Sequence, residues 1–373
     1  MKSIGIILAG GNNNRIGRLS DKRAIAALPV AGSYRAIDFT LSNMSNSRVS
    51  KVAVLPQFNA RSLNEHLSSS KWWDFGRKQG GLYVFTPTVT KNNNSWYQGT
   101  ADALYQNIDF LKKSHEPYVI IATGDGVYKM DYGKVLEAHI AKNADITVVY
   151  TTLKDTDDDL TRFGVLKLDE NERIVEFEEK PLVASSNNVS IGVYVIRRRH
   201  LIEILERCAR EDRHDFVQDV LVRYRNVRKI YGYKLDTYWR NIATVDSYYK
   251  TNMDFLKKDV RDYFFKQYPD VYSKVDDLPP AKYNTGAEVK NSIISSGCIV
   301  NGKVENSIIF KDVYIGNNCT IKNSIILNDV YIGDDSYIEN CIVESRDTIR
   351  ANSYFVGEGE VKIVVERNER YVI

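Results

Sequence analysis

The sequence predicts an α/β domain with a Rossmann-like, mainly parallel sheet, followed by a C-terminal left-handed parallel β-helix. In the first two thirds of the chain, short apolar runs alternate with stretches of helical spacing, and near the C-terminus apolar residues recur about every six positions. At 373 residues, the chain is also long for one compact core. We therefore expect an α/β domain at 1–256, a linker at 257–284 and a β-helix at 285–373.

The α/β prediction depends on buried strands that alternate with amphipathic helices. Helical spacing is found at 101–112, where Leu104, Ile108 and Leu111 fall on one face, and at 134–141. Strands and helices in alternation imply a mainly parallel sheet covered on both faces, with ligands at the carboxyl ends of its strands. The apolar runs stand at 4–8, 52–55, 118–122, 146–150 and 191–196.

The β-helix prediction depends on an internal repeat. Asn-Ser-Ile-Ile stands at 291, 306 and 323, and its variant Asn-Cys-Ile-Val at 340, so the last two intervals are 17 residues each. From Ile309 to Val343 the apolar spacings are 6, 6, 5, 6, 6 and 5. One coil cannot bury its apolar residues alone, so coils stack and share a core. A β-sandwich with chance similarity is the alternative. All five histidines precede the repeat, which favours assembly and regulation over catalysis there.

Composition excludes several classes of partner. The formal net charge is +3, from 51 basic and 48 acidic residues, without a long run of one sign. Neither nucleic acid nor an acidic membrane surface is therefore expected. The four cysteines form no CxxC pair, which is typical of free thiols in a reducing compartment. No apolar stretch is long enough for a signal peptide or membrane span, so we expect a cytoplasmic protein.

A glycine-rich turn follows the first predicted strand. The segment 8–15 reads LAGGNNNR, in which Gly10 and Gly11 expose backbone N–H groups and Arg15 adds a charged fork. Such a turn can hold phosphate oxygens. An ordinary turn between a strand and a helix is the alternative, since the spacing is neither that of a dinucleotide fingerprint nor that of a P-loop.

Seven further motifs accompany this turn. They are YRAIDFTLSNMSNS at 34–47, WYQGTADA at 96–103, GDGVYKMDY at 124–132, RFG at 162–164, EFEEKP at 176–181, SIGVY at 190–194 and YWRNIAT at 238–244. In this order, and followed by the C-terminal repeat, the motifs resemble those of the glucose-1-phosphate adenylyltransferase (ADP-glucose pyrophosphorylase) family. The resemblance extends over essentially the whole chain. The resemblance implies transfer between ATP and glucose 1-phosphate, giving ADP-glucose and pyrophosphate for glycogen biosynthesis, with Mg²⁺ bridging the phosphates.

The resemblance carries over most of the substrate-binding residues. It implies that Glu179 and Lys180 meet the glucose and its phosphate, and that four residues shape the pocket around them. A further group matches the nucleotide side, and Gly164 lies in the RFG motif. The pocket residues are Ser190, Tyr194, Asp215 and Trp239, and the nucleotide-side residues are Gln98, Gly99, Thr100 and Asp102.

The side that should hold the triphosphate departs from the family pattern. Arg15 is kept, but Asn13 stands at a loop glycine position, and Ile25-Ala26 replaces Lys-Pro, which deletes a positive charge. Asp125 matches one metal ligand, whereas Asn241 stands at the second aspartate, and a neutral amide is a weaker Mg²⁺ ligand than a carboxylate. Ala243 also replaces a glycine.

These departures make the chain resemble a GlgD-type regulatory subunit, weak or inactive alone, in a heterotetramer with a catalytic homologue. Losing one preorganised charge typically costs about 10²–10³ in rate, and two independent losses about 10⁴–10⁶. The resemblance also places Lys22 and Arg23 near an effector site. Three alternatives stay open: an active adenylyltransferase with an altered metal site, a non-enzymatic sensor of sugar phosphate or nucleotide, and transfer to another sugar phosphate.

Overall fold

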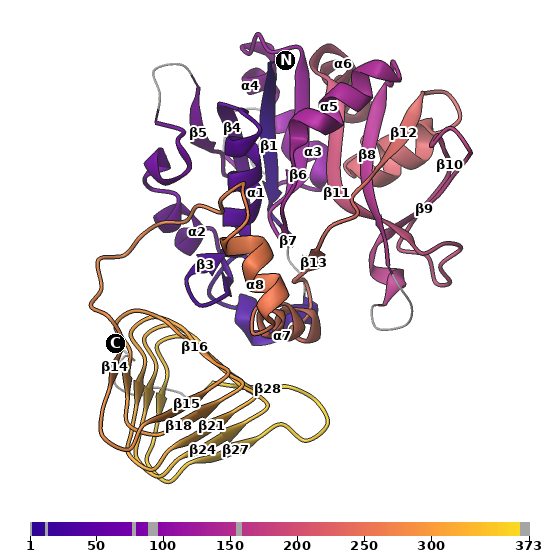
Figure 1. Ribbon diagram of the computed structural model, residues 1–373. Coiled ribbons are helices and arrows are strands. Elements are labelled where there is room, and N and C mark those ends of the chain that lie inside the picture. Colours follow the sequence, from indigo (N-terminus) through magenta and orange to yellow (C-terminus); the bar gives the residue numbers. More distant parts are fainter. Residues whose placement is uncertain (1, 12–13, 77–79, 89–95, 154–158, 366–373) are drawn as a thin grey trace. The chain divides into compact units, whose positions relative to one another are not determined.

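The computed structural model describes residues 2–11, 14–76, 80–88, 96–153 and 159–365 (Figure 1). The chain forms two compact units, one of Met1–Gly11 and Phe39–Trp239, the other of Asn12–Asp38 and Arg240–Ile373. Residues 12–38 thus belong with the C-terminal repeat in space. The domain boundaries expected at 256 and 284 stay predictions.

The first unit is built on one mixed sheet. Its strand order is β10-β9-β11-β6-β1-β4-β5, and β8 pairs with both β11 and β12. The β6-β1-β4-β5 half and the β8–β12 pair are parallel, whereas β11 runs antiparallel to β6, β8 and β9. The strands are β1 (Ser3–Ala9), β4 (Lys51–Pro56), β5 (Gly81–Val84), β6 (Tyr118–Thr123), β8 (Ile146–Thr152), β9 (Gly164–Leu168), β10 (Ile174–Glu179), β11 (Asn188–Arg197) and β12 (Ile230–Lys234).

Helices with apolar stripes pack on this sheet. In α6 the buried side chains Leu201, Ile204, Leu205 and Cys208 recur at helical spacing and join one core with the strands. The first unit also holds the short strand β7 (Gly126–Tyr128). Its helices are α2 (Arg61–His66), η3 (Ser70–Trp73), α3 (Thr100–Gln106), α4 (Ile108–Lys112), α5 (Tyr132–Ala141), η4 (Leu160–Arg162), α6 (Arg198–Arg210) and η5 (Val217–Val222), while α1 (Ala36–Asn46) crosses from one unit to the other.

The helix expected over 101–112 is interrupted. Asn107 lies between α3 and α4, and its Nδ2 donates to Ala103 O at 2.9 Å and to Tyr97 Oη at 3.0 Å. A side-chain amide that bonds to the backbone competes with the helical ladder, which accounts for the break. The helix expected over 134–141 forms within α5, where the Asp131 carboxylate accepts from Gly133 N at 2.8 Å and caps the N-terminus.

The repeat folds into stacked coils with three parallel faces, consistent with the predicted left-handed β-helix (Figure 1). Each face is a five-stranded parallel sheet in the described part of the chain. Inward residues form continuous columns, such as Val300, Ile315, Ile332 and Ile349, and share one core. The strands are β14 (Lys282–Tyr283), β15 (Glu288–Lys290), β16 (Ile293–Ile294), β17 (Ile299–Val300), β18 (Lys303–Glu305), β19 (Ile308–Ile309), β20 (Tyr314–Ile315), β21 (Thr320–Lys322), β22 (Ile325–Ile326), β23 (Tyr331–Ile332), β24 (Tyr337–Glu339), β25 (Cys341–Val343), β26 (Thr348–Ile349), β27 (Tyr354–Val356) and β28 (Lys362–Val364).

The Asn-Ser pair of the repeat makes one corner of each coil. Asn291, Asn306, Asn323 and Asn340 have φ of 41°, 47°, 45° and 53°, a left-handed conformation that asparagine tolerates. The serines that follow them form a ladder between coils. Ser307 N donates to Ser292 Oγ at 3.1 Å, and Ser324 N donates to Ser307 Oγ at 3.0 Å. The repeated Asn therefore turns the chain, and the repeated Ser fixes the register of neighbouring coils.

The remaining elements of the second unit join the N-terminal segment to the coils. Tyr249 Oη donates to Asn323 O at 2.6 Å, and Ser295 Oγ donates to Gly32 O at 2.8 Å. The expected linker begins with a helix, α8. Besides the coils, the unit contains η1 (Asn14–Ser20), η2 (Ile25–Ala27), β2 (Pro29–Val30), β3 (Tyr34–Arg35), β13 (Trp239–Asn241), which starts in the first unit, α7 (Val245–Asp254) and α8 (Lys258–Phe265). Across the described ranges of both units, no helix has the length and apolar character needed to span a bilayer.

Candidate functional site

The glycine-rich turn lies at the carboxyl edge of the parallel strands. Ala9 is paired with Pro56 and Leu8 with Thr123, so β1, β4 and β6 end together. A Cβ on Gly10 would lie 3.2 Å from Gln57 Cβ, whereas one on Gly11 would meet nothing within 4 Å. The turn thus presents bare backbone at the edge where parallel sheets bind ligands.

Asp125 follows β6 at the same edge, on a segment that polar side chains of α1 hold in place. Thr40 Oγ1 donates to Thr123 O at 3.0 Å. Asn43 Nδ2 donates to Tyr128 O at 3.1 Å, and Asn43 Oδ1 accepts from Met130 N at 3.0 Å. The TLSN part of the motif at 34–47 is therefore a support for the segment that carries Asp125.

The SIGVY motif reaches this edge because β11 is antiparallel. Val193 is paired with Ala122, and a bulge lies between Ser190 and Val193. Gly192 has φ of 76°, and a Cβ there would lie 2.7 Å from Thr123 Cγ2. Ser190 is buried, and its Oγ accepts from Gly192 N at 3.3 Å and lies 3.5 Å from Tyr194 Oη. The bulge thus places the serine hydroxyl beside the tyrosine.

Three predicted carboxylates surround Tyr194. Burial raises the pKa of its hydroxyl well above the usual range, and the charges of Glu179, Asp215 and Asp125 raise it further, while the hydrogen bond with Ser190 acts in the opposite direction. These five residues come from four separate segments of the chain and interact electrostatically around the Tyr194 hydroxyl. The Tyr194 phenol is neutral there and can donate a hydrogen bond to a ligand oxygen.

The EKP motif ends β10 beside β9. Glu179 is paired with Gly164, where a Cβ would lie 2.8 Å from the Phe177 ring and 3.1 Å from Glu179 Oε2. Burial raises the pKa of the Glu179 carboxyl, Lys180 lowers it and Asp215 raises it. Lys180 Nζ lies 3.0 Å from Glu179 Oε1, yet 62% of the lysine side chain is exposed, against 16% of the glutamate side chain. Lys180 therefore offers an accessible positive charge next to a sheltered carboxylate.

Trp239 is buried against aromatic and glycine neighbours of the first unit. Its ring centroid lies 5.5 Å from that of Phe163, and its Nε1 lies 3.6 Å from where a Cβ on Gly126 would stand. The buried indole N–H donates no hydrogen bond to any part of the chain that the structure describes. A ligand oxygen could accept this N–H, since buried polar groups are usually paired.

The nucleotide-side motif is folded against residues 214–216. A Cβ on Gly99 would lie 2.4 Å from His214 O, which also accepts from Ala101 N at 2.7 Å. Thr100 Oγ1 accepts from Phe216 N at 2.8 Å. Gln98 N donates to Asp102 Oδ2 at 2.8 Å. Hydrogen bonds and close backbone packing therefore hold the start of α3 against the 214–216 segment.

The altered positions of the triphosphate side belong to the second unit. Ile25 is buried in η2, and Arg15 is exposed on η1. Asn241 Oδ1 accepts from Ala243 N at 2.9 Å, which forms a local turn. Asn13 lies outside the described residues. The side chain at the predicted lysine position is thus an apolar core residue.

Comparison with known proteins assigns the family. A nucleotidyl transferase family model matches residues 4–258, and a model of the GlmU-like C-terminal hexapeptide matches residues 279–362. The glucose-1-phosphate adenylyltransferase of Clostridium acetobutylicum is 39% identical over 321 residues, which is 85% of this chain and 84% of that protein. Those of Pseudothermotoga lettingae and Thermosipho melanesiensis are 39% and 36% identical, over 86% and 85% of this chain and 76% and 77% of theirs.

The chain belongs to the glucose-1-phosphate adenylyltransferase family. The family assignment and the predicted fold class are thereby confirmed. The roles carried over to individual residues, including the effector positions Lys22 and Arg23, stay predictions. Lys22 is exposed, while Arg23 is paired within its own unit with Glu344.

In this member of the family, the residues present are a poor fit for the Mg²⁺ that the resemblance implies. Within the described ranges, no group of three or more His, Cys, Asp or Glu side chains could hold a metal ion. The resemblance matches Asp125 and Asn241 to the family's two ligand positions, and only the first of these is a carboxylate.

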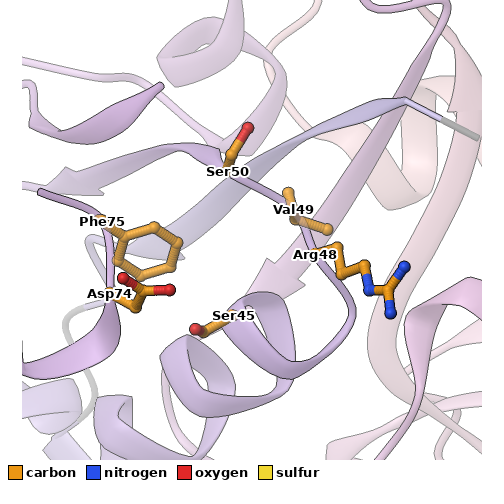
Figure 2. A pocket seen from close by; sticks show the side chains of 6 residues that line it. All are labelled: Ser45, Arg48, Val49, Ser50, Asp74 and Phe75. Atoms are coloured by element: carbon orange, nitrogen blue, oxygen red, sulfur yellow. The ribbon is translucent and has the colours of Figure 1, made fainter. Parts of the chain in front are cut away.

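A cavity in the first unit is lined by none of the predicted site residues. It has a volume of about 240 Å³ and is lined by Ser45, Arg48, Val49, Ser50, Asp74 and Phe75 (Figure 2). Ser50 directly precedes β4, so this cavity is at the amino end of that strand. Ligands of open α/β sheets bind at the opposite edge, and we assign the cavity no ligand.

Several residues that shape the site were not among the site residues predicted from the sequence. Phe163 contacts Trp239, and Phe216 lies 5.4 Å from Tyr194 between ring centroids. Asp219 binds the backbone of the 214–216 segment. Its signal in the sequence is the spacing of four from Asp215 at the start of a helical stretch, where carboxylates commonly cap backbone N–H groups.

Proposed function

We propose that this chain is a regulatory, catalytically impaired subunit of glucose-1-phosphate adenylyltransferase. It acts in a cytoplasmic hetero-oligomer with a catalytic homologue in glycogen biosynthesis. The name of its relatives supplies the reaction class, the transfer of an adenylyl group to glucose 1-phosphate. The observation that carries the proposal is the pair of substitutions at Ile25 and Asn241.

These substitutions affect the charges that the reaction needs. Nucleotidyl transfer depends on positioning and on neutralising charge at the phosphates. Ile25 is 7% exposed, so the apolar side chain fills a core position and offers no cation. Asn241 presents an uncharged amide whose Oδ1 already accepts from Ala243 N at 2.9 Å. With about 10²–10³ lost for each charge-stabilising group, we expect the two changes together to reduce the rate by about 10⁴–10⁶.

The sugar side supports retained binding. Lys180 offers an exposed ammonium next to Glu179, and the buried indole N–H of Trp239 suits a ligand oxygen. We expect glucose 1-phosphate or ADP-glucose to bind, and Lys180→Ala to weaken binding about tenfold or more, the loss of roughly one charge-assisted hydrogen bond. Lys167→Ala is the matched control, because Lys167 lies on the same hairpin and pairs with Glu176 at 2.6 Å.

A subunit of this kind acts by shifting the conformational equilibrium of its partner. The ends of the β-helix offer the contact, since open sheet edges in soluble proteins are covered or paired. At the first coil, Tyr283 on the edge strand β14 and Val289 on the edge strand β15 are 53% and 37% exposed. We expect this rim, with the final segment 361–365, to contribute subunit contacts.

Co-expression with a catalytic homologue tests the proposal. The wild-type chain should assemble with the catalytic chain and change its kcat or effector response, and Asp125→Ala should preserve that change. If Asp125→Ala abolishes the effect, this chain's own site performs chemistry and the impaired-subunit proposal is wrong.

The rim is tested by the double substitution Tyr283→Asp and Val289→Asp in the full-length chain. Deleting the chain after residue 284 would be a poor test, because residues 12–38 would lose Ser295 and Glu344 as partners. The rim variant should assemble less well with the catalytic chain. Full assembly by a folded rim variant would place the interface elsewhere.

A further inference from the structure

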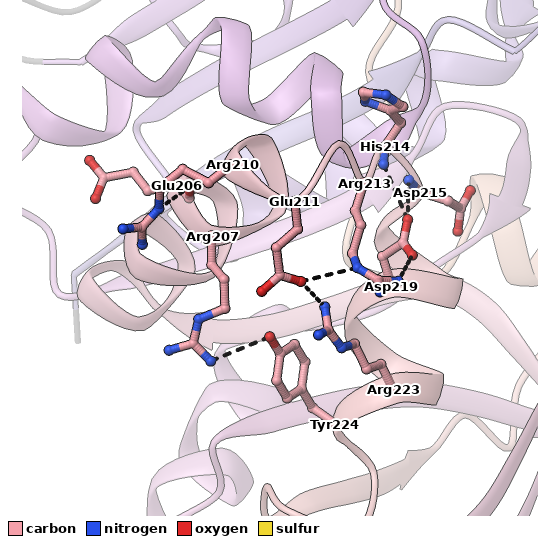
Figure 3. A network of polar contacts seen from close by, with 10 residues as sticks. All are labelled: Glu206, Arg207, Arg210, Glu211, Arg213, His214, Asp215, Asp219, Arg223 and Tyr224. Atoms are coloured by element: carbon pink, nitrogen blue, oxygen red, sulfur yellow. Dashed lines mark hydrogen bonds and ion pairs between the residues drawn. The ribbon is translucent and has the colours of Figure 1, made fainter.

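We propose that Asp219 is a positioning residue that holds the sugar side and the nucleotide side of the site in register. The inference rests on the proposed function for the identity of the ligands, and on the geometry of residues 213–219 for everything else. Asp219 lies on η5 within a network of polar contacts that surrounds this segment (Figure 3).

The Asp219 carboxylate binds two consecutive backbone N–H groups. Its Oδ2 accepts from His214 N at 3.1 Å and from Asp215 N at 2.9 Å. Its Oδ1 accepts from Arg213 Nη1 at 3.2 Å. Asp215 in turn accepts from Gln218 N at 2.8 Å through Oδ1 and caps the start of the helical stretch. Three contacts from one carboxylate therefore fix the path of the chain through residues 213–215.

The segment 213–215 is hydrogen-bonded to the residues of the nucleotide side. Because Asp219 fixes the backbone at residue 214, it also fixes the position of the His214 carbonyl. This carbonyl accepts from Ala101 N at 2.7 Å and from Asp102 N at 3.2 Å. Gly99 gives His214 O room to approach, because any Cβ at Gly99 would lie 2.4 Å from it. A shift of the His214 backbone would thus move the first turn of α3 with it.

The same segment also acts on the sugar side, through Asp215 and Phe216. The charge of Asp215 raises the pKa of both Glu179 and Tyr194, so its carboxylate acts electrostatically on these two groups. The Phe216 ring packs against that of Tyr194 at a tilt of 53°, with ring centroids 5.4 Å apart. Because Asp219 fixes the Asp215 backbone, it also fixes where this carboxylate points.

Glu211 provides a matched control within the same network. It binds Arg213 and Arg223 through their side chains, with Arg213 Nε donating to Glu211 Oε2 at 3.1 Å. No described backbone group of residues 214–216 donates to Glu211. Removing the Glu211 carboxylate therefore disturbs the arginines and leaves the loop backbone in place.

The first test is amide hydrogen exchange of the full-length, ligand-free protein. In Asp219→Ala, we expect faster exchange in peptides that cover 98–106 as well as 213–219, although 98–106 is more than 100 residues away in sequence. Glu211→Gln should leave exchange in 98–106 unchanged. Unchanged exchange at 98–106 in Asp219→Ala would overturn the proposal, whatever the protein binds.

The second test is calorimetry with glucose 1-phosphate and with ATP as separate probes. Asp219→Ala should weaken both by similar factors of about tenfold, whereas Asp215→Ala should weaken glucose 1-phosphate alone. Asp219→Glu should restore neither, because its longer side chain moves the carboxylate away from the two N–H groups. Loss of a single ligand in Asp219→Ala would contradict the positioning role. A wild-type chain that binds neither ligand would contradict the retained binding proposed above, while hydrogen exchange would still decide the role of Asp219.

Discussion

Arg23 and Glu344 form an ion pair in the second unit, although 321 residues separate them in sequence. The arginine side chain is 12% exposed and the glutamate side chain 7%. Arg23 Nη1 also donates to Ser345 Oγ at 3.2 Å, and Ser345 N donates to Glu344 Oε1 at 2.7 Å. The pair ties the N-terminal segment to a coil of the β-helix. An anionic effector at Arg23 would have to compete with Glu344 for the same guanidinium.

Breaking this pair should destabilise the protein markedly. Removing one partner of a buried ion pair leaves an uncompensated charge and costs about 3–5 kcal/mol, whereas replacing both by apolar side chains is often neutral. We expect Arg23→Met to lower the free energy of unfolding in urea by about that amount, and the double variant Arg23→Met/Glu344→Leu to recover most of it.

The control for this prediction is the exposed pair Arg346–Asp329, in which the two side chains are 84% and 48% exposed. Arg346→Met should change the free energy of unfolding by no more than about 1 kcal/mol. Equal effects of Arg23→Met and Arg346→Met would show that the Arg23–Glu344 pair is not a tie between the two segments.

Gly99 should not tolerate a side chain. In Gly99→Ala the new Cβ would lie 2.4 Å from the backbone oxygen of His214, and backbone atoms on both sides cannot move cheaply. We expect a loss of about 1–3 kcal/mol in stability, comparable to overpacking, together with weaker ATP binding. Gly76→Ala is the control, because a Cβ there meets nothing within 4 Å. Equal melting temperatures for the two variants would contradict the close approach of Gly99 to His214.

His139 should make stability depend on pH below neutrality. Its side chain is buried, and Nδ1 lies 2.9 Å from Thr147 Oγ1. Burial lowers its pKa from 6.5 to about 4, with Arg197 and His200 adding to this and Asp145 opposing it. Between these two values the unfolded chain binds a proton that the folded chain does not, so the free energy of unfolding falls as the pH falls, by up to about 1.4 kcal/mol per pH unit. Above pH 6.5 both states are neutral and His139 adds no pH dependence.

Urea unfolding between pH 7 and pH 5 measures this effect. His139→Gln should show a flatter dependence than the wild type, because carboxylates contribute equally to both proteins. Parallel curves for the two proteins would mean that His139 titrates alike in the folded and unfolded states.

The parts of the fold that the sequence predicts are those with local or periodic signals. The Asn-Ser-Ile-Ile repeat predicts stacked coils, because each residue type performs the same task in each coil, as Asn306 and Asn323 show with φ of 47° and 45°. The strands of the sheet are likewise predicted from apolar runs. The antiparallel direction of β11 could not be predicted in this way, since apolar runs carry no information on strand direction.

Contacts between distant residues account for most of what the sequence could not predict. The segment 12–38 belongs to the second unit and is held there by pairs such as Arg23–Glu344. The local sequence around either residue does not predict such a contact. Lys180 takes a left-handed φ of 50° without a glycine or asparagine to indicate it. Asp219 acts through backbone N–H groups, and its spacing of four from Asp215 is a weak signal that many helix starts share. Motif resemblance predicts residues that bind the ligand, and it gives no prediction for residues such as Asp219 that hold their backbone in place.

The most direct test of the impaired-subunit account is the turnover of the purified chain alone. The assay supplies ATP, glucose 1-phosphate and Mg²⁺ and measures the ADP-glucose formed. Ordinary enzymes turn over at about 1–10³ s⁻¹. With Ile25 and Asn241 at the altered positions, we predict ADP-glucose synthesis slower by about 10⁴ or more, while glucose 1-phosphate or ADP-glucose still binds. Asp125→Ala, measured in parallel, shows whether any residual rate belongs to this chain. An ordinary turnover that Asp125→Ala abolishes would contradict the account and identify the chain as an active adenylyltransferase.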